Sequence, residues 1–129
     1  MVGMTQTILD LIQQLDKNAT PDVVLYENLL HCIDFTIDAN YLSFIKEYNG
    51  AGGFVGESFI YLWSIEDVIK LNPYYADDER TFSLLFFGSN GGMCGYAFDK
   101  TTGNILEVDW IGLDTILMGS TFEEFLSHL

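Results

Sequence analysis

Three short apolar runs in the second half of the chain constrain its fold most. They cover residues 82–87, 93–98 and 105–108, and each is rich in aromatic or branched side chains. Such runs are typical of β-strands, and the glycine-containing segments between them are typical of turns. Because strands joined by short turns pair with their chain neighbours, we expect an antiparallel meander.

The first half of the chain is predicted to be largely helical. Ile8, Leu11, Ile12 and Leu15 follow helical spacing, which predicts a helix over residues 5–17. Thr20 before Pro21 is typical of an N-cap, so residues 21–32 should form a second helix. Its inward side chains would be Val24, Leu25 and Leu29. A strand is the alternative there, because Val23 and Val24 are β-branched.

The next segments have clear start and stop signals. Asp38 can cap a third helix that runs to Tyr48, and Asn49-Gly50 can end it. The glycine-rich residues 50–56 are expected to be a loop, and residues 58–63 a strand.

Two further helices are predicted by their caps. Ser64 can begin a short helix that Asn72-Pro73 would stop. Ser120 or Thr121, with Glu123 or Glu124 three residues later, forms a capping box for a last helix.

These elements predict one α+β domain over residues 1–129. A chain of 129 residues with 49% hydrophobic residues can bury a single core. The sheet should be mostly antiparallel, with a mixed sheet as the alternative, and the helices should pack on one side of it. Its other side could then be open to a partner. Residues 1–20 are interpreted as an N-terminal helical extension.

The charge balance restricts the partners of such a domain. Nineteen acidic against five basic side chains give a formal net charge of -14. Nucleic acids and anionic membranes are therefore poor partners, whereas a basic protein suits the charge. Solubility is the alternative explanation of the acidity. Residues 1–15 have neither a basic start nor an unbroken apolar run, so we expect no signal peptide and a cytoplasmic location.

Catalytic chemistry is not indicated by the sequence. Cys32 and Cys94 lack the spacing of a zinc site and are expected to be buried free thiols. His31 and His128 both have structural explanations, and no pair of carboxylates is singled out. The glycine-rich residues 88–95 lead into a strand and not a helix, so a hairpin is favoured over an anion site. We expect no enzyme activity, cofactor or metal.

An ordered set of motifs runs through most of the chain. The motifs are Tyr41-x-x-Phe44-Ile45-x-x-Tyr48-Asn49-Gly50, Leu62-Trp63-Ser64-Ile65-Glu66-Asp67-Val68, Phe86-Phe87-Gly88-Ser89-Asn90-Gly91-Gly92, Tyr96-Ala97-Phe98-Asp99 and Ser120-Thr121-Phe122-Glu123-Glu124-Phe125-Leu126. Together they resemble the SUKH superfamily, which includes a yeast cell-wall-synthesis regulator and many bacterial proteins. The resemblance covers residues 26–129, and Asp38 stands where such proteins often have a proline.

The resemblance implies an α+β fold without shared catalytic residues. Bacterial relatives are widely proposed to be immunity proteins that neutralise toxins, often nucleases, so an acidic surface could imitate a phosphate backbone. A regulatory or scaffold domain is the alternative, and an enzyme has the least support. We expect partner contacts on the loops that flank the meander. The candidates are Asp77, Asp78, Glu79, Glu107, Asp109, Trp110 and Asp114.

Overall fold

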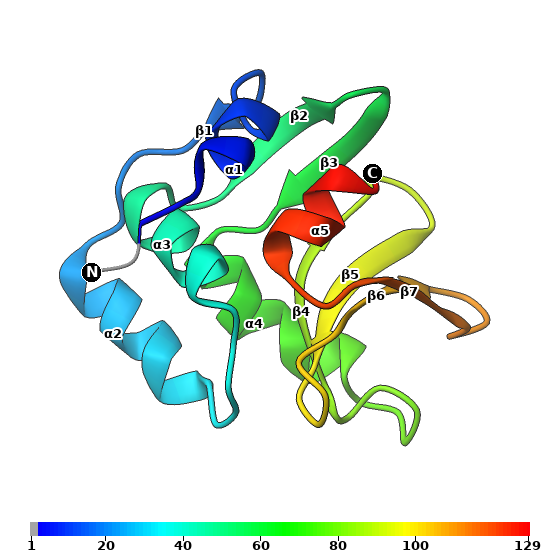
Figure 1. Ribbon diagram of the computed structural model, residues 1–129. Coiled ribbons are helices and arrows are strands. Elements are labelled where there is room, and N and C mark those ends of the chain that lie inside the picture. Colours follow the sequence, from blue (N-terminus) through cyan, green and yellow to red (C-terminus); the bar gives the residue numbers. More distant parts are fainter. Residues whose placement is uncertain (1–2) are drawn as a thin grey trace.

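A seven-stranded antiparallel sheet runs through the molecule, with its strands in chain order. The computed structural model describes residues 3–129, and Figure 1 shows the sheet beside the helices. The predicted α+β class and antiparallel meander are confirmed. The strands are β1 (Asp16–Lys17), β2 (Ala51–Val55), β3 (Ser58–Leu62), β4 (Leu84–Ser89), β5 (Cys94–Asp99), β6 (Ile105–Asp109) and β7 (Thr115–Gly119).

Local capping sets where the helices begin. Asp38 accepts hydrogen bonds from the Asn40 and Tyr41 amides, and Ser64 and Thr121 cap the helices that follow them. These three predicted caps are confirmed. The helices are α1 (Gln6–Leu11), α2 (Val23–Cys32), α3 (Ala39–Glu47), α4 (Ile65–Tyr75) and α5 (Phe122–Ser127).

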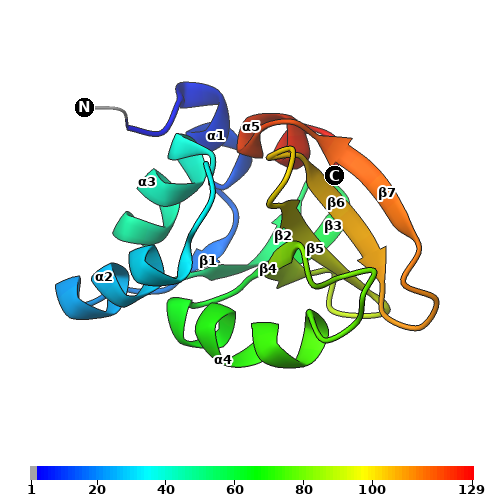
Figure 2. The same ribbon diagram turned by 90° about the horizontal axis from the view of Figure 1, so that it is seen from below.

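The main core lies between the helices and one face of the sheet, which we call the helix-covered face. Alternate side chains of the strands point to it, such as Leu85 and Phe87 of β4, because successive residues of a strand face opposite ways. Tyr41 of α3 packs edge-on against Phe87 and Phe98, with ring centroids 5.3 and 5.1 Å apart. Figure 2 shows α1 and α5 on the side of the strands away from α4.

The second face of the sheet, which we call the open face, carries a smaller buried cluster. Leu84 and Phe86 of β4 belong to it, with Ala97 and Val108 of the next two strands. The last turn of α4 reaches this cluster, since the ring of Tyr75 lies 6.0 Å from that of Phe86. The predicted helix layer therefore covers one face, and the end of α4 adds partial cover to the other.

Helix α4 lies against β4 where β3 has diverged from it. The Asn72 amide group accepts from the Phe86 N–H at 2.7 Å and donates to the Phe86 carbonyl at 2.9 Å. It thus replaces the strand partner that Phe86 lacks on this side. The same amide donates to the Val68 carbonyl at 2.6 Å. The predicted stop at Asn72-Pro73 was wrong: α4 continues through Pro73 to Tyr75, whose ring packs against Phe86.

Two expectations for the N-terminal half were also wrong. The first helix ends at Leu11, and Asp16–Lys17 forms β1 on the edge of the sheet instead of a helical turn. The glycine-rich residues 51–55 form β2 and not a loop. Both segments gain backbone hydrogen bonds from a neighbouring strand, which local propensity does not register.

Burial differs from expectation at several side chains. Asp22 and not Thr20 caps α2, whose Val24 is 64% exposed whereas Leu29 is buried. Cys94 is half-buried and Cys32 is exposed, so the predicted burial of both thiols was wrong, although both are free. Cys32 lies in the last turn of α2, at the helix end.

Candidate protein-binding surface

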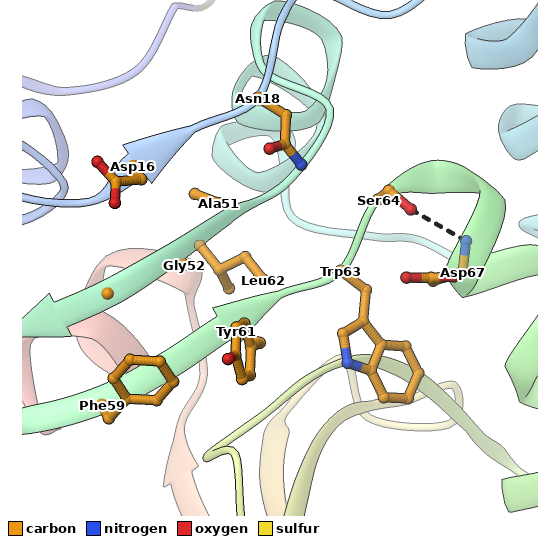
Figure 3. A pocket seen from close by; sticks show the side chains of 11 residues that line it. Asp16, Asn18, Ala51, Gly52, Phe59, Tyr61, Leu62, Trp63, Ser64 and Asp67 are labelled. Atoms are coloured by element: carbon orange, nitrogen blue, oxygen red, sulfur yellow. Dashed lines mark hydrogen bonds between the residues drawn. The ribbon is translucent and has the colours of Figure 1, made fainter.

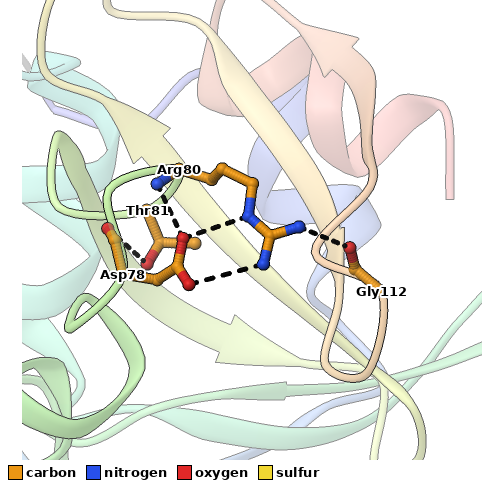
Figure 4. A network of polar contacts seen from close by, with 4 residues as sticks. All are labelled: Asp78, Arg80, Thr81 and Gly112. Carbon is orange, nitrogen blue, oxygen red and sulfur yellow. Dashed lines mark hydrogen bonds and ion pairs between the residues drawn. The ribbon is translucent and has the colours of Figure 1, made fainter.

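The loop after α4 places three acidic residues beside the turn between β6 and β7. The Asp78 carboxylate accepts from the Arg80 amide at 2.8 Å and from the Arg80 Nε at 3.0 Å. Arg80 Nη1 in turn donates to the Gly112 carbonyl at 3.3 Å, as Figure 4 shows. Arg80, which was not among the predicted contact residues, therefore joins the two loops.

The charged groups at this junction shift one another's pKa values. Hydrogen bonds from Arg80 lower the pKa of Asp78. The pKa of Arg80 is raised, first by its hydrogen bond to Asp78 and then by the negative charges of Asp78, Glu79 and Asp114. One cation thus lies among three carboxylates, and this junction of the two loops keeps a net negative charge.

Asp109 has a structural role in the turn that it begins. Its Oδ1 accepts from the Ile111 amide at 2.8 Å and from the Gly112 amide at 3.2 Å. Leu113, with φ of 59°, adopts the left-handed conformation that closes the turn. The Asp109 carboxylate is therefore engaged in the turn, whereas Asp77, Glu79 and Asp114 are exposed.

Trp110 fixes this turn against the end of α4. Its ring stacks on Tyr75, with centroids 4.2 Å apart and planes at 27°, and lies 5.2 Å from the Phe86 ring. Gly95 makes room for it, since a Cβ there would lie 2.1 Å from the Trp110 ring. Trp110 is half-buried, so it leaves part of an aromatic surface beside the carboxylates.

Glu107 does not join the other predicted residues. It is the cross-strand neighbour of Tyr96, whose side chain belongs to the main core, so Glu107 lies on the helix-covered face. Burial, with a further contribution from the Glu107 charge, raises the pKa of Tyr96 to about 12. The structure thus brings six of the seven predicted residues together. We call these six the acidic corner: Asp77, Asp78, Glu79, Asp109, Trp110 and Asp114.

Residues 3–129 contain neither a metal-binding cluster nor a membrane-spanning helix. No group of three or more histidine, cysteine or acidic side chains in this range is arranged to hold a metal ion. None of its helices combines the length and the apolar character needed to cross a membrane.

Comparison with known proteins identifies the family. No curated protein sequence matches the chain. A family model described as the SMI1 / KNR4 family (SUKH-1) matches residues 22–128, which include the acidic corner and every strand except β1. The match confirms the suspected superfamily. The chain therefore belongs to the SMI1/KNR4 (SUKH-1) family.

Proposed function

We propose that this protein is an immunity protein that binds a cognate toxin and blocks it by occlusion. Membership of the SUKH-1 family supports a role in protein binding. The observation that carries the proposal is the acidic corner, where Arg80 joins two acidic loops and Trp110 stacks on Tyr75. Rigid aromatic anchors beside charged groups are typical of protein-binding surfaces.

The charge of the whole chain supports a basic site on the toxin, as a nuclease would present. A net charge of -14 attracts such a site over several ångströms and speeds its encounter with the corner. Most of the few basic side chains are engaged elsewhere. Lys17 donates to two carbonyls of its own segment, Lys46 lies over the Tyr26 ring, and Lys100 pairs with Asp34.

The members of the acidic corner have different roles in this proposal. Asp78 and Asp109 shape their loops through hydrogen bonds, so they act by holding the surface in place. Asp77, Glu79 and Asp114 are exposed and offer their carboxylates to the toxin. Trp110 supplies apolar contact area. Glu107, on the other face, is not part of this contact.

Co-expression tests the proposal. The chain is produced together with the product of the gene immediately upstream of its own, in cells that this product kills. We expect growth to be restored and the two proteins to purify as one complex. Failure of both would contradict an immunity function and favour the regulatory or scaffold alternative, in which deletion alters cell-wall or signalling phenotypes without any toxin gene.

Charge reversal tests the contact itself. The Asp77→Lys/Glu79→Lys variant changes two exposed carboxylates that shape no loop. We expect this variant to bind the toxin about tenfold more weakly, or worse. The Glu27→Lys/Glu57→Lys variant makes the same change of net charge at exposed positions elsewhere and serves as the control. Equal binding by the two variants would contradict the acidic corner as the contact.

A further inference from the structure

A groove on the open face shares no lining residue with the acidic corner, although the ring of its Trp63 lies 5.8 Å from that of Tyr75. It runs across β1, β2 and β3 to the first turn of α4 and has a volume of about 610 Å³. Figure 3 shows the rings of Phe59, Tyr61 and Trp63 along one side of it, with Asp16 and Asp67 at its two ends. None of the five basic residues of the chain lines it.

The aromatic side of the groove is preformed. Phe59 and Tyr61 pack edge to face, with ring centroids 4.8 Å apart and planes at 83°. The Tyr61 ring lies over Gly52 of β2, where a Cβ would be 3.1 Å from it. Because Gly52 has no side chain, the ring can lie against the strand. Tyr61 nevertheless remains 48% exposed, so this ring surface is available to a ligand.

Neither carboxylate of the groove forms an ion pair within residues 3–129. Asp16 belongs to β1 and Asp67 to the first turn of α4, and both are exposed. The ion pairs found within residues 3–129 are Asp78 with Arg80 and Asp34 with Lys100. The negative charge of the groove is therefore not neutralised from within the described part of the chain.

Aromatic faces between carboxylates attract one chemical class of side chain. A cation gains from the ring faces and from the carboxylates together, whereas an anion would be repelled. Arginine suits the groove better than lysine, because its flat guanidinium stacks on rings while its N–H groups donate to carboxylates. The volume exceeds that of one side chain, so residues next to the arginine would also fit.

We propose that this groove receives an arginine side chain of the protein partner, as a second contact beside the acidic corner. The inference rests on the proposed function, because the partner is then the toxin. It adds a requirement that the toxin surface present an arginine to β1, β2 and β3, away from the loops of the acidic corner.

The first test uses a small probe in place of the partner. The capped tripeptide Gly-Arg-Gly is titrated into the ¹⁵N-labelled full chain and followed by NMR. We expect saturable shifts at the Gly52 and Tyr61 amides and at the Trp63 indole N–H. The same peptide with citrulline, which is neutral and of the same shape, should bind at least about fivefold more weakly. Equal binding of both peptides, or shifts scattered over the surface, would overturn the proposal.

Matched variants separate the groove from general charge attraction. Tyr61→Ala and Asp16→Asn/Asp67→Asn should each weaken arginine-peptide binding by about fivefold or more. The controls are Tyr74→Ala, at a tyrosine that is 75% exposed on α4, and Glu27→Gln/Glu57→Gln, which removes the same charge elsewhere. Circular dichroism checks that each variant is folded. Controls that lose binding equally would overturn the proposal.

The toxin gives an independent readout. If Tyr61→Ala binds the toxin as tightly as the unaltered chain, the groove proposal fails and the immunity function stands. If the chain protects against no toxin but the arginine peptide still binds in the groove as expected, the immunity function fails and the groove's preference for arginine stands. Weaker toxin binding by Tyr61→Ala, with Tyr74→Ala unaffected, would support both.

Discussion

At the scale of single residues, the buried hydroxyl of Tyr41 should lower the stability of the fold. Tyr41 is 1% exposed, and its hydroxyl has no hydrogen-bond partner within residues 3–129. An unpaired buried hydroxyl destabilises a protein by about 1–3 kcal/mol. We therefore expect Tyr41→Phe to raise the free energy of unfolding by about 1 kcal/mol in urea titrations at neutral pH. If Tyr41→Phe instead lowered the free energy of unfolding by about 1 kcal/mol, the hydroxyl would have a hydrogen-bond partner and the expectation would be wrong.

Tyr41 should also make the stability of the fold depend on pH in the alkaline range. Burial raises the pKa of Tyr41 above its ordinary value, as it does for Tyr96. In the unfolded chain both ionise near pH 10. Stability present below that pH is therefore lost as the pH rises above it, by up to about 1.4 kcal/mol per pH unit for each group. Tyr41→Phe should reduce this slope in urea titrations above about pH 10, and an unchanged slope would contradict the burial.

The lack of a side chain at Gly95 should be required for Trp110 to stack on Tyr75. A methyl group at this position would overlap the Trp110 ring, 2.1 Å away. We expect Gly95→Ala to displace the ring from Tyr75, to shift tryptophan fluorescence and to cost about 1–3 kcal/mol of stability. Gly92→Ala is the control, because the nearest atom to a Cβ there is 3.6 Å away, at the end of a side chain. Equal effects would show that Trp110 is not confined by Gly95.

Local chemistry explains which residues could be predicted. The Asp38, Ser64 and Thr121 caps depend on the residues that follow within one turn, so the sequence alone indicated them. Burial depends on the rest of the fold. Cys32 was predicted to be buried from its apolar neighbours but lies exposed at the end of α2.

At the scale of elements, Asn72 joins α4 to β4. Its side chain is bonded to both backbone groups of Phe86 and to the Val68 carbonyl. Asn72→Ala leaves the Phe86 groups unpaired at a half-buried site, so we expect a loss of about 2–4 kcal/mol in urea titrations. Asn72→Asp, which keeps the acceptor and lacks the donor, should still lose stability. No loss with either variant would contradict the bridge.

The elements that the sequence did not predict are those that depend on a neighbouring strand. β1 has two residues, β2 is rich in glycine, and β7 lies at the edge with its first three residues exposed. None has a strong strand pattern of its own. β2 and β7 pair with the predicted strands β3 and β6, and β1 pairs with β2. The three meander strands, by contrast, are rich in aromatic or branched side chains and were predicted.

At the scale of the whole molecule, the fold gathers charge from distant segments. Arg80 joins Asp78 to Gly112, and the groove combines Asp16 of β1 with Asp67 of α4. The loops of the acidic corner could be suggested from the sequence, because they flank predicted strands. Their meeting and the separation of Glu107 could not, since both depend on strand register. The groove was missed because residues 16 and 17 were predicted to be helical.

In the proposed function, the acidity of this protein guides it to a basic site on a toxin. The most direct test is the association rate constant with the toxin that the chain neutralises, measured by stopped flow. Raising the salt from about 20 mM to about 150 mM should slow association about tenfold or more, with a smaller change in dissociation. Asp77→Lys/Glu79→Lys should associate more slowly than Glu27→Lys/Glu57→Lys. A rate that is independent of salt and equal in both variants would contradict the claim.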